Sequence, residues 1–324
     1  MGGAADYHRE AVDLSVVFAG TAGSVPTARR GLPATLLRRG GERILFDCGE
    51  GAQRQLTRSV GLAELDEVYI THLHLDHWLG LPGMIKSFEL RDRDRPLTVY
   101  GPKGIKQAME GLRFILGRVK YGLRVVELEE WEDVEKDGYT ISAIPVRHRV
   151  PAFGYAIVED ERPGRFDAEL AKARGVPFGP DFGRLQRGET VNGVTPEEVI
   201  GPARAGRKIV ISGDTAPCDP LRVAAHHADL LIHEATFTED EHDRARETGH
   251  STARQAALLA EDADVGLLAL IHLSTRYGGR EIREEARATF PHTVVPRDFD
   301  IVEVPFPEKG DPTLHRLDGE RVPV

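Results

Sequence analysis

Cysteine is scarce in this sequence. Only two of the 324 residues are cysteine, Cys48 and Cys218, and they stand far apart in the chain. Two cysteines make no disulfide framework, and two isolated thiolates cannot complete a thiolate zinc site. Any metal bound by this protein must therefore use histidine and carboxylate ligands, and we expect a reducing, cytoplasmic location.

Long apolar runs are also missing. No stretch approaches the roughly 20 apolar residues that a membrane-spanning helix needs. The first residues, MGGAADYHREAVD, lack the apolar core of a signal peptide. Hydrophobic residues make up 40% of the chain and charged residues 29%, which is typical of a globular protein. We therefore expect a globular chain with no membrane partner.

Positive charge is in deficit. The chain has 42 lysine and arginine residues against 52 aspartate and glutamate residues, which gives a formal net charge of −10. Taken alone, this acidity argues against a nucleic-acid partner, because phosphates are repelled. Net charge is only a global sum, however, and a local basic surface or bound metal ions can still attract a polyanion. The acidity is thus a weak argument against a nucleic-acid substrate.

The apolar residues fall in short runs that end in turn or polar residues. Runs rich in Val, Ile and Leu predict strands at Leu14–Ala19, Ala34–Leu37, Arg43–Phe46, Glu67–Ile70, Leu97–Tyr100, Leu123–Leu128, Tyr139–Val146, Gly154–Val158, Lys208–Ile211, Leu230–Ile232 and Leu267–Ile271. Apolar residues at i, i+3 and i+4 predict helices at Gly51–Ser59, Leu81–Arg91, Ile105–Leu116, Thr252–Glu261 and Glu281–Ala288. Ser251 is the expected N-cap of the fourth helix. The mixture predicts an α/β (α+β) fold with sheets covered by helices.

One segment interrupts this pattern. From about Glu161 to Arg207 the apolar periodicity fades, and glycine, proline and charged residues take over. A segment of this length with little regular structure is uncommon inside a compact domain and is often functional. The alternative is a variable surface loop or linker. Because candidate metal ligands lie on both sides of it, we expect a single domain over residues 1–324, with residues 161–207 inserted into it.

The densest group of ligand-type residues follows the predicted strand Glu67–Ile70. His72, His74, Asp76 and His77 fall within six residues. Because side chains alternate along an extended chain, His72 and His74 point to the same side, and the turn that follows brings Asp76 and His77 to a second position. Imidazole nitrogen and carboxylate oxygen are the ligands that zinc accepts where thiolates are absent. This arrangement predicts a metal site.

Three more apolar runs end in a residue of the same kind. ISAIPVRH, IVISGD and LLALIH finish at His148, Asp214 and His272. Each alone could be a strand that ends at a polar turn, but together they supply the second half of a two-metal site. The expected ligands are His72, His74 and His148 for one ion, Asp76, His77 and His272 for the other, and Asp214 as the bridge. Two ions roughly 3.5–4 Å apart share a hydroxide and stabilise an in-line displacement.

These ligands and their spacing resemble the metallo-β-lactamase superfamily, and within it the chain resembles the ribonuclease Z family over nearly its whole length. The shared motifs are FDCGEGAQRQ (Phe46–Gln55), THLHLDHWLGLPG (Thr71–Gly83), HRVPAFGY (His148–Tyr155), SGDT (Ser212–Thr215), HEATF (His233–Phe237), GHST (Gly249–Thr252) and HLSTRY (His272–Tyr277). The resemblance implies an αββα sandwich, which is two mixed sheets covered by helices, with a protruding substrate arm.

The resemblance also implies an activity. The chain would be a hydrolase, a phosphodiesterase that cuts the 3′ trailer from precursor tRNA with two zinc ions per subunit, or with manganese in the same nitrogen and oxygen ligands. Asp76 would orient the attacking hydroxide and act as general base. His250 would protonate the leaving 3′ oxygen, and Glu234 would orient its imidazole. The products would be a tRNA with a 3′-hydroxyl and a trailer with a 5′-phosphate.

By the same resemblance, residues 161–207 correspond to the arm with which ribonuclease Z enzymes grip the tRNA elbow. In the family the arm of one subunit serves the site of the other, which implies a homodimer. The cations in this segment that could pair with phosphates are Lys172, Arg174, Arg184 and Arg187. Near the N-terminus, SVPTARR resembles a substrate-contacting loop and offers Arg29 and Arg30, although Thr27 and Ala28 leave a lysine of some relatives unmatched.

Two alternatives remain open. A related hydrolase of small phosphodiesters, sulfate esters or lactones would keep the seven ligands but would not need the arm. An inactive tRNA-binding or metal-buffering protein would not need Glu234 and His250. The remaining histidines receive no catalytic role: we expect a structural His233, a solvated helix at His226 and His227, and surface positions for His8, His242, His292 and His315.

Overall fold

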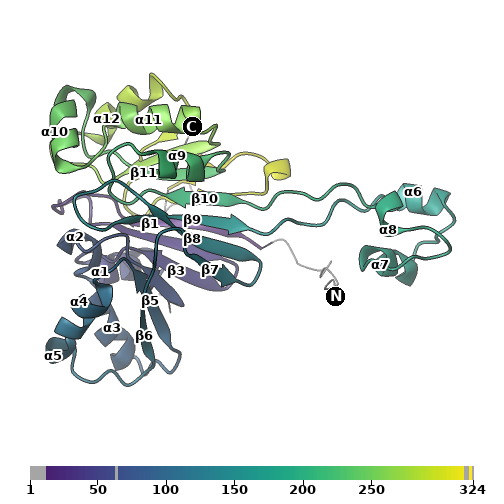
Figure 1. Ribbon diagram of the computed structural model, residues 1–324, viewed down its shortest axis with the longest axis horizontal. Coiled ribbons are helices and arrows are strands. Elements are labelled where there is room, and N and C mark those ends of the chain that lie inside the picture. Colours follow the sequence, from purple (N-terminus) through teal and green to yellow (C-terminus); the bar gives the residue numbers. More distant parts are fainter. Residues whose placement is uncertain (1–11, 63–64, 317–320, 323–324) are drawn as a thin grey trace. The chain divides into compact units, whose positions relative to one another are not determined.

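The computed structural model describes residues 12–62, 65–316 and 321–322. Contacts divide the chain into two units. Of the described residues, the main unit comprises those of Asp13–Val158 and those from Arg207 onward, and the smaller unit comprises Glu159–Gly206 with Val12. The main unit consists of two sheets with helices packed on them (Figure 1). His8 lies outside the described residues, so the expectation for it stays untested.

The first sheet has nine strands in the order β16-β15-β14-β1-β2-β3-β4-β5-β6. They are β1 (Leu14–Gly20), β2 (Ala34–Arg39), β3 (Glu42–Phe46), β4 (Glu67–Tyr69), β5 (Leu97–Gly101), β6 (Leu123–Glu127), β14 (Ile301–Glu303), β15 (Thr313–His315) and β16 (Arg321–Val322). From β3 to β6 neighbouring strands are parallel, whereas β1 pairs antiparallel with β2 and β14. Along β1, Val16 and Phe18 face one apolar cluster and Val17 and Ala19 face another. Both faces are covered, which explains the continuous apolar runs in the sequence.

The second sheet has seven strands in the order β13-β12-β11-β10-β9-β8-β7. They are β7 (Asp133–Lys136), β8 (Tyr139–Pro145), β9 (Phe153–Glu159), β10 (Lys208–Ile211), β11 (Leu230–Glu234), β12 (Leu267–Ile271) and β13 (Thr293–Val294). The strands from β10 to β13 are parallel, and β9 is antiparallel to β10. The carboxyl ends of β10, β11 and β12 therefore meet at one edge, where ligand sites of parallel sheets form.

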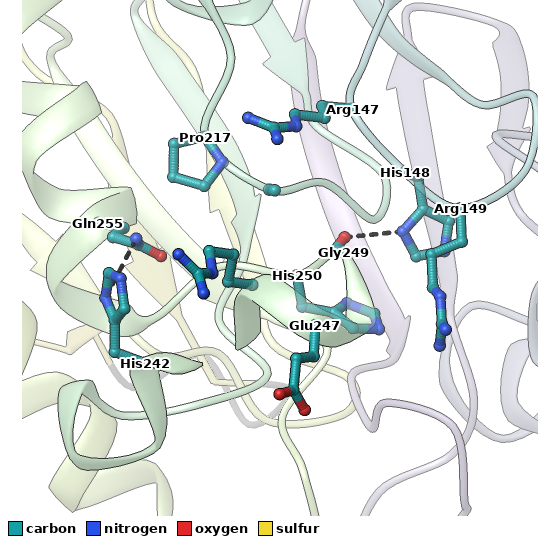
Figure 2. Close-up of a pocket in the computed structure, with 11 residues that line it drawn as sticks. Arg147, His148, Arg149, Pro217, His242, Glu247, Gly249, His250 and Gln255 are labelled. Carbon is teal, nitrogen blue, oxygen red and sulfur yellow. Dashed lines mark hydrogen bonds between the residues drawn. The ribbon is translucent and has the colours of Figure 1, made fainter. Parts of the chain in front are cut away.

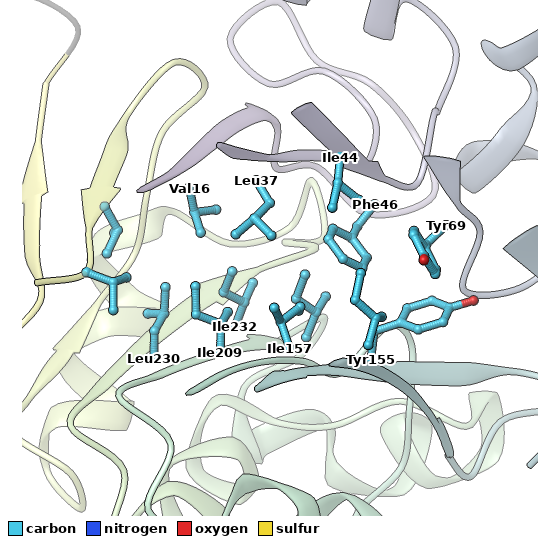
Figure 3. Close-up of a cluster of buried hydrophobic side chains, with 14 of the residues drawn as sticks. Val16, Leu37, Ile44, Phe46, Tyr69, Tyr155, Ile157, Ile209, Leu230 and Ile232 are labelled. Carbon is cyan, nitrogen blue, oxygen red and sulfur yellow. The ribbon is translucent and has the colours of Figure 1, made fainter. Parts of the chain in front are cut away.

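Apolar and aromatic side chains fill the space between the two sheets (Figure 3). The rings of Phe46 and Tyr69 stack with centroids 5.4 Å apart, and the ring of Tyr155 lies edge-on to Tyr69 at 5.3 Å. The buried Tyr155 hydroxyl donates a hydrogen bond of 2.7 Å to the Ile70 carbonyl. This bond satisfies the only polar atom of the ring and ties β9 to the chain just before the Thr71–His77 cluster.

Helices cover the outer faces of both sheets, and their apolar sides form one cluster on each face. The helices of the first half of the main unit are α1 (Ala52–Ser59), α2 (Leu75–Trp78), α3 (Leu81–Leu90), α4 (Ile105–Gly111) and α5 (Arg113–Leu116). Those of the second half are α9 (Asp219–Ala225), α10 (His242–Thr248), α11 (Ala253–Asp262) and α12 (Gly279–Arg287), with the 3₁₀ turns η1 (Glu239–Glu241) and η2 (Pro307–Lys309). The predicted αββα sandwich is confirmed. No helix among the described residues is long and apolar enough to cross a membrane.

Two predictions about helix ends are wrong. The N-cap of α11 is Thr252 and not Ser251: the Thr252 hydroxyl accepts from the Gln255 amide at 3.1 Å, and the Gln255 side chain accepts from the Thr252 amide at 3.0 Å. The Ser251 hydroxyl instead donates to the Thr215 carbonyl at 2.6 Å. The predicted helix Ile105–Leu116 is divided into α4 and α5, and α4 ends at Gly111, a poor helix former.

The smaller unit corrects the expectation of little regular structure between Glu161 and Arg207. It contains the helices α6 (Ala168–Ala173), α7 (Pro180–Gln186) and α8 (Pro196–Val199) around a separate apolar cluster. Phe182, Leu185 and Val191 are buried in this cluster. Asp167 caps α6 by accepting from the Leu170 amide at 2.9 Å. Some of the glycine and proline residues that suggested a loop stand at helix ends, such as Pro180 in the first turn of α7.

Candidate metal centre

The seven predicted ligands meet where strands of both sheets end. β4 leads through Ile70 and Thr71 to His72, and His74 precedes the single-turn helix α2, which presents Asp76 and His77. The other three ligands follow β8, β10 and β12. Their ligand atoms form two contiguous groups, each within 4.8 Å, namely His72, His74, His148 and Asp214, and Asp76, His77 and His272. A third group of the same kind joins Asp214, His250 and His272.

The first group is built from three imidazoles and a carboxylate. The Nδ1 atom of His74 lies 3.0 Å from Nε2 of His72 and 3.3 Å from Nε2 of His148. The Oδ2 atom of Asp214 lies 3.7 Å from Nε2 of His72. The three nitrogens therefore converge on one position that a carboxylate oxygen also approaches.

The second group shares the same carboxylate. The Nε2 atoms of His77 and His272 lie 3.3 Å apart, and each is 3.5 Å from Oδ2 of Asp76. Oδ2 of Asp214 lies 3.4 Å from Nε2 of His77 and 3.3 Å from Nε2 of His272. Asp214 thus stands between the two groups, in the position expected of a bridging ligand.

Hydrogen bonds fix the proton on Nδ1 in three of the rings, those of His77, His148 and His272. The Nδ1 atom of His148 donates to the Gly249 carbonyl at 2.8 Å, and Nδ1 of His77 donates to Oδ2 of Asp47 at 2.7 Å. The Thr236 hydroxyl donates its proton to Glu234 and so accepts from Nδ1 of His272 at 2.8 Å. The Nε2 atoms of these three rings are therefore left to face the cluster, where each can bind a metal ion once it is unprotonated. The donor set fits a divalent metal ion.

The electrostatic environment differs between the proposed ligands. Burial lowers the pKa of His77, but the carboxylates of Asp214 and Asp47 raise it well above its usual value, so this ring must lose a proton to bind a metal ion. Burial lowers the pKa of His72 well below its usual value and lowers the pKa of His148, so both rings favour the neutral form that binds metals. Burial opposes ionisation of Asp214, but the imidazoles of His272 and His77 hold the pKa of its carboxyl well below its usual range. Asp76 likewise has a lowered pKa because its hydrogen bond and charge interaction with His272 outweigh burial.

A carboxylate–imidazole pair adjoins both groups. Nδ1 of His250 lies 2.8 Å from Oε1 of Glu234 and 3.8 Å from Oδ2 of Asp214. The Glu234 carboxylate also accepts from the amides of Thr215 and Ser251, each at 3.1 Å, so its position is fixed. Burial lowers the pKa of His250, but the charge of Glu234 and its hydrogen bond raise it to about 9. The ring is therefore protonated at neutral pH and is a proton donor beside the metal centre.

The structure adds residues that the sequence did not single out. Asp47, within the motif FDCGEGAQRQ, accepts from the Thr71 amide at 2.8 Å as well as from His77. The Ser24 amide donates to Oδ2 of Asp76 at 2.9 Å. A Cβ on Gly23 would lie 2.6 Å from Nδ1 of His272, so this position requires glycine. These residues orient ligands that the sequence did predict, and the shared motif was the only signal for Asp47.

The two arginines of the N-terminal loop differ in position. Arg29 is exposed. The guanidinium of Arg30 points inward, where it donates to the Thr21 hydroxyl at 2.5 Å and to the Pro296 carbonyl at 2.7 Å. Arg30 therefore holds the loop in place, and only Arg29 presents its charge to solvent.

The four predicted cations of the smaller unit are all paired with acids of that unit. Lys172 binds Glu169 at 2.7 Å, and Arg174 binds Glu198. Arg184 and Arg187 approach Glu189 at 2.8 Å and 3.7 Å. A phosphate would have to replace these carboxylates or share the cations with them.

The other described histidines have the predicted burial or exposure, although two lie outside the predicted helix. His233 is buried and its Nδ1 donates to the Glu234 carbonyl at 2.7 Å. His226 and His227 are exposed just beyond the end of α9 rather than on the helix itself. His292 is exposed, and His242 and His315 are partly exposed.

A cavity of about 350 Å³ adjoins the metal centre (Figure 2). His148 and His250 are among the residues that line it, and their two rings lie 5.1 Å apart. Arg147, Arg149 and Arg246 also line it. A second cavity of about 340 Å³, lined by Ser24, Phe237 and Arg276 among others, also reaches His250. The general-acid candidate is therefore accessible to a substrate from two cavities.

Comparison with known proteins points to one family. A beta-lactamase superfamily domain matches residues 42–191. Ribonuclease Z of Halorubrum lacusprofundi is 43% identical over 310 residues, which covers 93% of this chain and 100% of the relative. Ribonuclease Z of Natronomonas pharaonis is 45% identical and covers 92% of this chain and 100% of the relative. The crystal structure of human tRNase Z, short form, superposes with a TM-score of 0.66 at 27% identity, over 90% of this chain and 99% of that chain.

Proposed function

Because this chain belongs to the ribonuclease Z family, we propose that it is the endoribonuclease that removes the 3′ trailer from precursor tRNA. The chain is a hydrolase of the metallo-β-lactamase fold that processes the 3′ end of tRNA. The observation that carries this function is the Glu234–His250 pair, 2.8 Å between Oε1 and Nδ1, beside two groups of metal-ligand residues. It would supply a proton donor next to the residues that would hold the activating ions.

The metal content is part of the proposal. A divalent metal is implied by the family and the donor set, and we propose two zinc ions, with manganese as the alternative. His72, His74 and His148 would hold one, Asp76, His77 and His272 the other, and Asp214 both. When bound, the ions lower the pKa of water and neutralise charge that develops on the phosphoryl oxygens.

The protein residues carry the proton transfers. Asp76, fixed by the Ser24 amide at 2.9 Å, would accept a proton from the attacking water and orient it toward phosphorus. As the new P–O bond forms, the bond from phosphorus to the 3′ oxygen of the mature tRNA breaks. His250 would give its proton to that oxygen, and Glu234 would stabilise the imidazolium before this step. The products are a tRNA 3′-hydroxyl and a trailer 5′-phosphate.

The remaining parts of the proposal concern partners and location. The precursor tRNA would be held by residues 161–207, inserted into a single catalytic domain over residues 1–324, with Lys172, Arg174, Arg184 and Arg187 as candidate contacts. Arg29 would contact the RNA from the N-terminal loop, whereas Arg30 would act by supporting that loop. We expect a homodimer, in which the arm of one subunit serves the site of the other, in the cytoplasm.

A 3′-extended tRNA transcript tests this function. Purified protein is incubated with the transcript, with and without a chelator, and the cut site is mapped. We expect one cut after the discriminator nucleotide, lost with chelator and restored by zinc or manganese. An intact transcript together with rapid hydrolysis of a small phosphodiester would favour the small-substrate alternative. Deletion of residues 161–207 separates the two further, because only precursor-tRNA cleavage should depend on the arm.

A further inference from the structure

The cavity beside His148 and His250 has three arginines in its lining. Arg147 and Arg149 flank His148 in the turn after β8, and Arg246 lies on α10. All three are exposed. Figure 2 shows Arg147 and Arg149 around the Gly249–His250 turn. Three arginine residues therefore line one small cavity in a chain whose net charge is −10.

Their partners distinguish these arginines from those of the smaller unit. Arg174, Arg184 and Arg187 pair with acids there. Over residues 12–62, 65–316 and 321–322, no ion pair joins the guanidinium of Arg147, Arg149 or Arg246 to a carboxylate. The one acid that lines the cavity is Glu247, so the lining keeps an excess of positive charge. Unpaired guanidinium groups bind phosphate in bidentate fashion, since their geometry matches its oxygens.

The backbone that carries the arginines is fixed. The Arg147 amide donates to the Thr215 hydroxyl at 3.1 Å, and the Arg147 carbonyl accepts from the Ala216 amide at 2.8 Å. Gly249, with φ of 76°, ends α10 three residues after Arg246 and passes close to Arg149, because a Cβ there would lie 3.2 Å from its Cγ. Only the side chains remain to be ordered by a ligand, which reduces the entropic cost of binding.

We propose that this cavity binds a backbone phosphate of the substrate RNA, the one on the 5′ side of the last mature nucleotide, through Arg147, Arg149 and Arg246. The inference rests on the proposed function. His250 protonates the 3′ oxygen of that nucleotide, so groups just beyond His250 face its sugar and its 5′ phosphate. A volume of about 350 Å³ lies at the small end of ligand cavities and suits one sugar-phosphate unit.

The test compares charged and neutral linkages in the RNA. One 3′-extended tRNA carries a methylphosphonate at the proposed phosphate, and another carries it within the trailer. Arg147→Gln, Arg149→Gln and Arg246→Gln are each assayed for kcat/KM on both and on the unmodified precursor. Arg113→Gln is the control, since Arg113 on α5 has a side chain that is 73% exposed and pairs with Glu110. Thermal unfolding checks that every variant is folded.

We expect each cavity variant to lower kcat/KM on the unmodified precursor by about tenfold or more, as for loss of a charge-assisted hydrogen bond. The neutral linkage at the proposed phosphate should lower kcat/KM of the wild-type protein by a similar factor. On that precursor the cavity variants should have the same kcat/KM as the wild-type protein. In the cavity variants, kcat/KM for the unmodified precursor should fall more than kcat/KM for bis(p-nitrophenyl) phosphate. The small substrate has no second phosphate for the arginines to bind.

Three results would overturn the inference. The first is that Arg113→Gln lowers kcat/KM as much as the cavity variants do. The second is that the cavity variants lower kcat/KM on the precursor with the neutral linkage as much as on the unmodified precursor. The third is that their effect disappears only on the precursor with the methylphosphonate in the trailer. If the wild-type protein cuts precursor tRNA and the cavity variants cut it with the same kcat/KM, only this inference is wrong. A wild-type protein that cuts no precursor removes the proposed function, and the inference falls with it.

Discussion

The buried carboxylate of Glu234 accepts the Nδ1 proton of His250 at 2.8 Å. The same carboxylate accepts from the amides of Thr215 and Ser251, so it cannot turn away from the ring. The charge of Glu234 raises the pKa of His250 to about 9 against the opposing effect of burial. A ring that is protonated at neutral pH and oriented by a fixed carboxylate is suited to donate a proton to a leaving oxygen.

Replacement of His250 tests that role. His250→Ala should lower kcat for precursor-tRNA cleavage by about 10²–10⁴-fold, the range expected for a general acid. A substrate whose scissile 3′ oxygen is replaced by sulfur needs no proton on its leaving group. On that substrate the variant should recover most of the wild-type rate. Single-turnover rates on both substrates provide the measurement, and a variant equally slow on each would exclude His250 as the acid.

Asp47 should act through His77. Its carboxylate accepts from Nδ1 of His77 at 2.7 Å and from the Thr71 amide at 2.8 Å, which fixes the tautomer and the position of a proposed ligand. Asp47→Asn should weaken metal binding by about 10–100-fold, because such outer contacts orient the ligand and increase its basicity. Competition of the protein with a chromophoric chelator measures the affinity. Asp133→Asn, at an exposed position on β7, is the control, and an equal affinity in both variants would contradict the prediction.

Gly23 should be intolerant of a side chain. A Cβ at this position would lie 2.6 Å from Nδ1 and 2.7 Å from the backbone oxygen of His272. Gly23→Ala must displace the imidazole or the loop, so we expect kcat/KM for precursor tRNA to fall at least tenfold, about the effect of a 1.4 kcal/mol change in barrier. Gly41→Ala is the matched control, since nothing lies within 4 Å of its Cβ. Wild-type activity in Gly23→Ala would show that the loop moves freely.

The long strands of the fold could be predicted because they are buried on both faces, which makes their apolar runs continuous. The eleven predicted strands are all present, whereas β7 and the short strands β13 to β16 were missed. Strands of two or three residues, such as β13 and β14, carry no detectable period. The helices α6 to α8 were missed because glycine and proline at their ends suggested a loop, although Pro180 in the first turn of α7 is also a start signal.

The candidate ligands could be predicted because each follows a strand or lies in the short segment after it, as Asp76 and His77 do on α2. Their roles stay predictions, which their convergence supports. The contacts that orient them depend on parts of the chain that are far apart, as Gly23 and His272 are, and no local spacing records such a pair. Arg30 shows the same limit: its motif suggested an RNA contact, whereas its guanidinium donates to Thr21 and Pro296.

The smaller unit offers a test that leaves the proposed metal ligands unchanged. Leu185 is fully buried in its apolar cluster, whereas Leu170 on α6 is 37% exposed. Leu185→Ala should destabilise this unit by about 2–5 kcal/mol, and Leu170→Ala should cost much less. A unit with so few buried residues would then open locally, so amide protons of residues 159–206 should exchange faster while those of β10 to β12 keep their protection.

If residues 161–207 hold the tRNA, kcat/KM for precursor tRNA should fall in Leu185→Ala relative to that for a small phosphodiester. If the amide protons of residues 159–206 lose their protection and precursor tRNA is still cleaved at the wild-type rate, substrate binding does not require a folded arm.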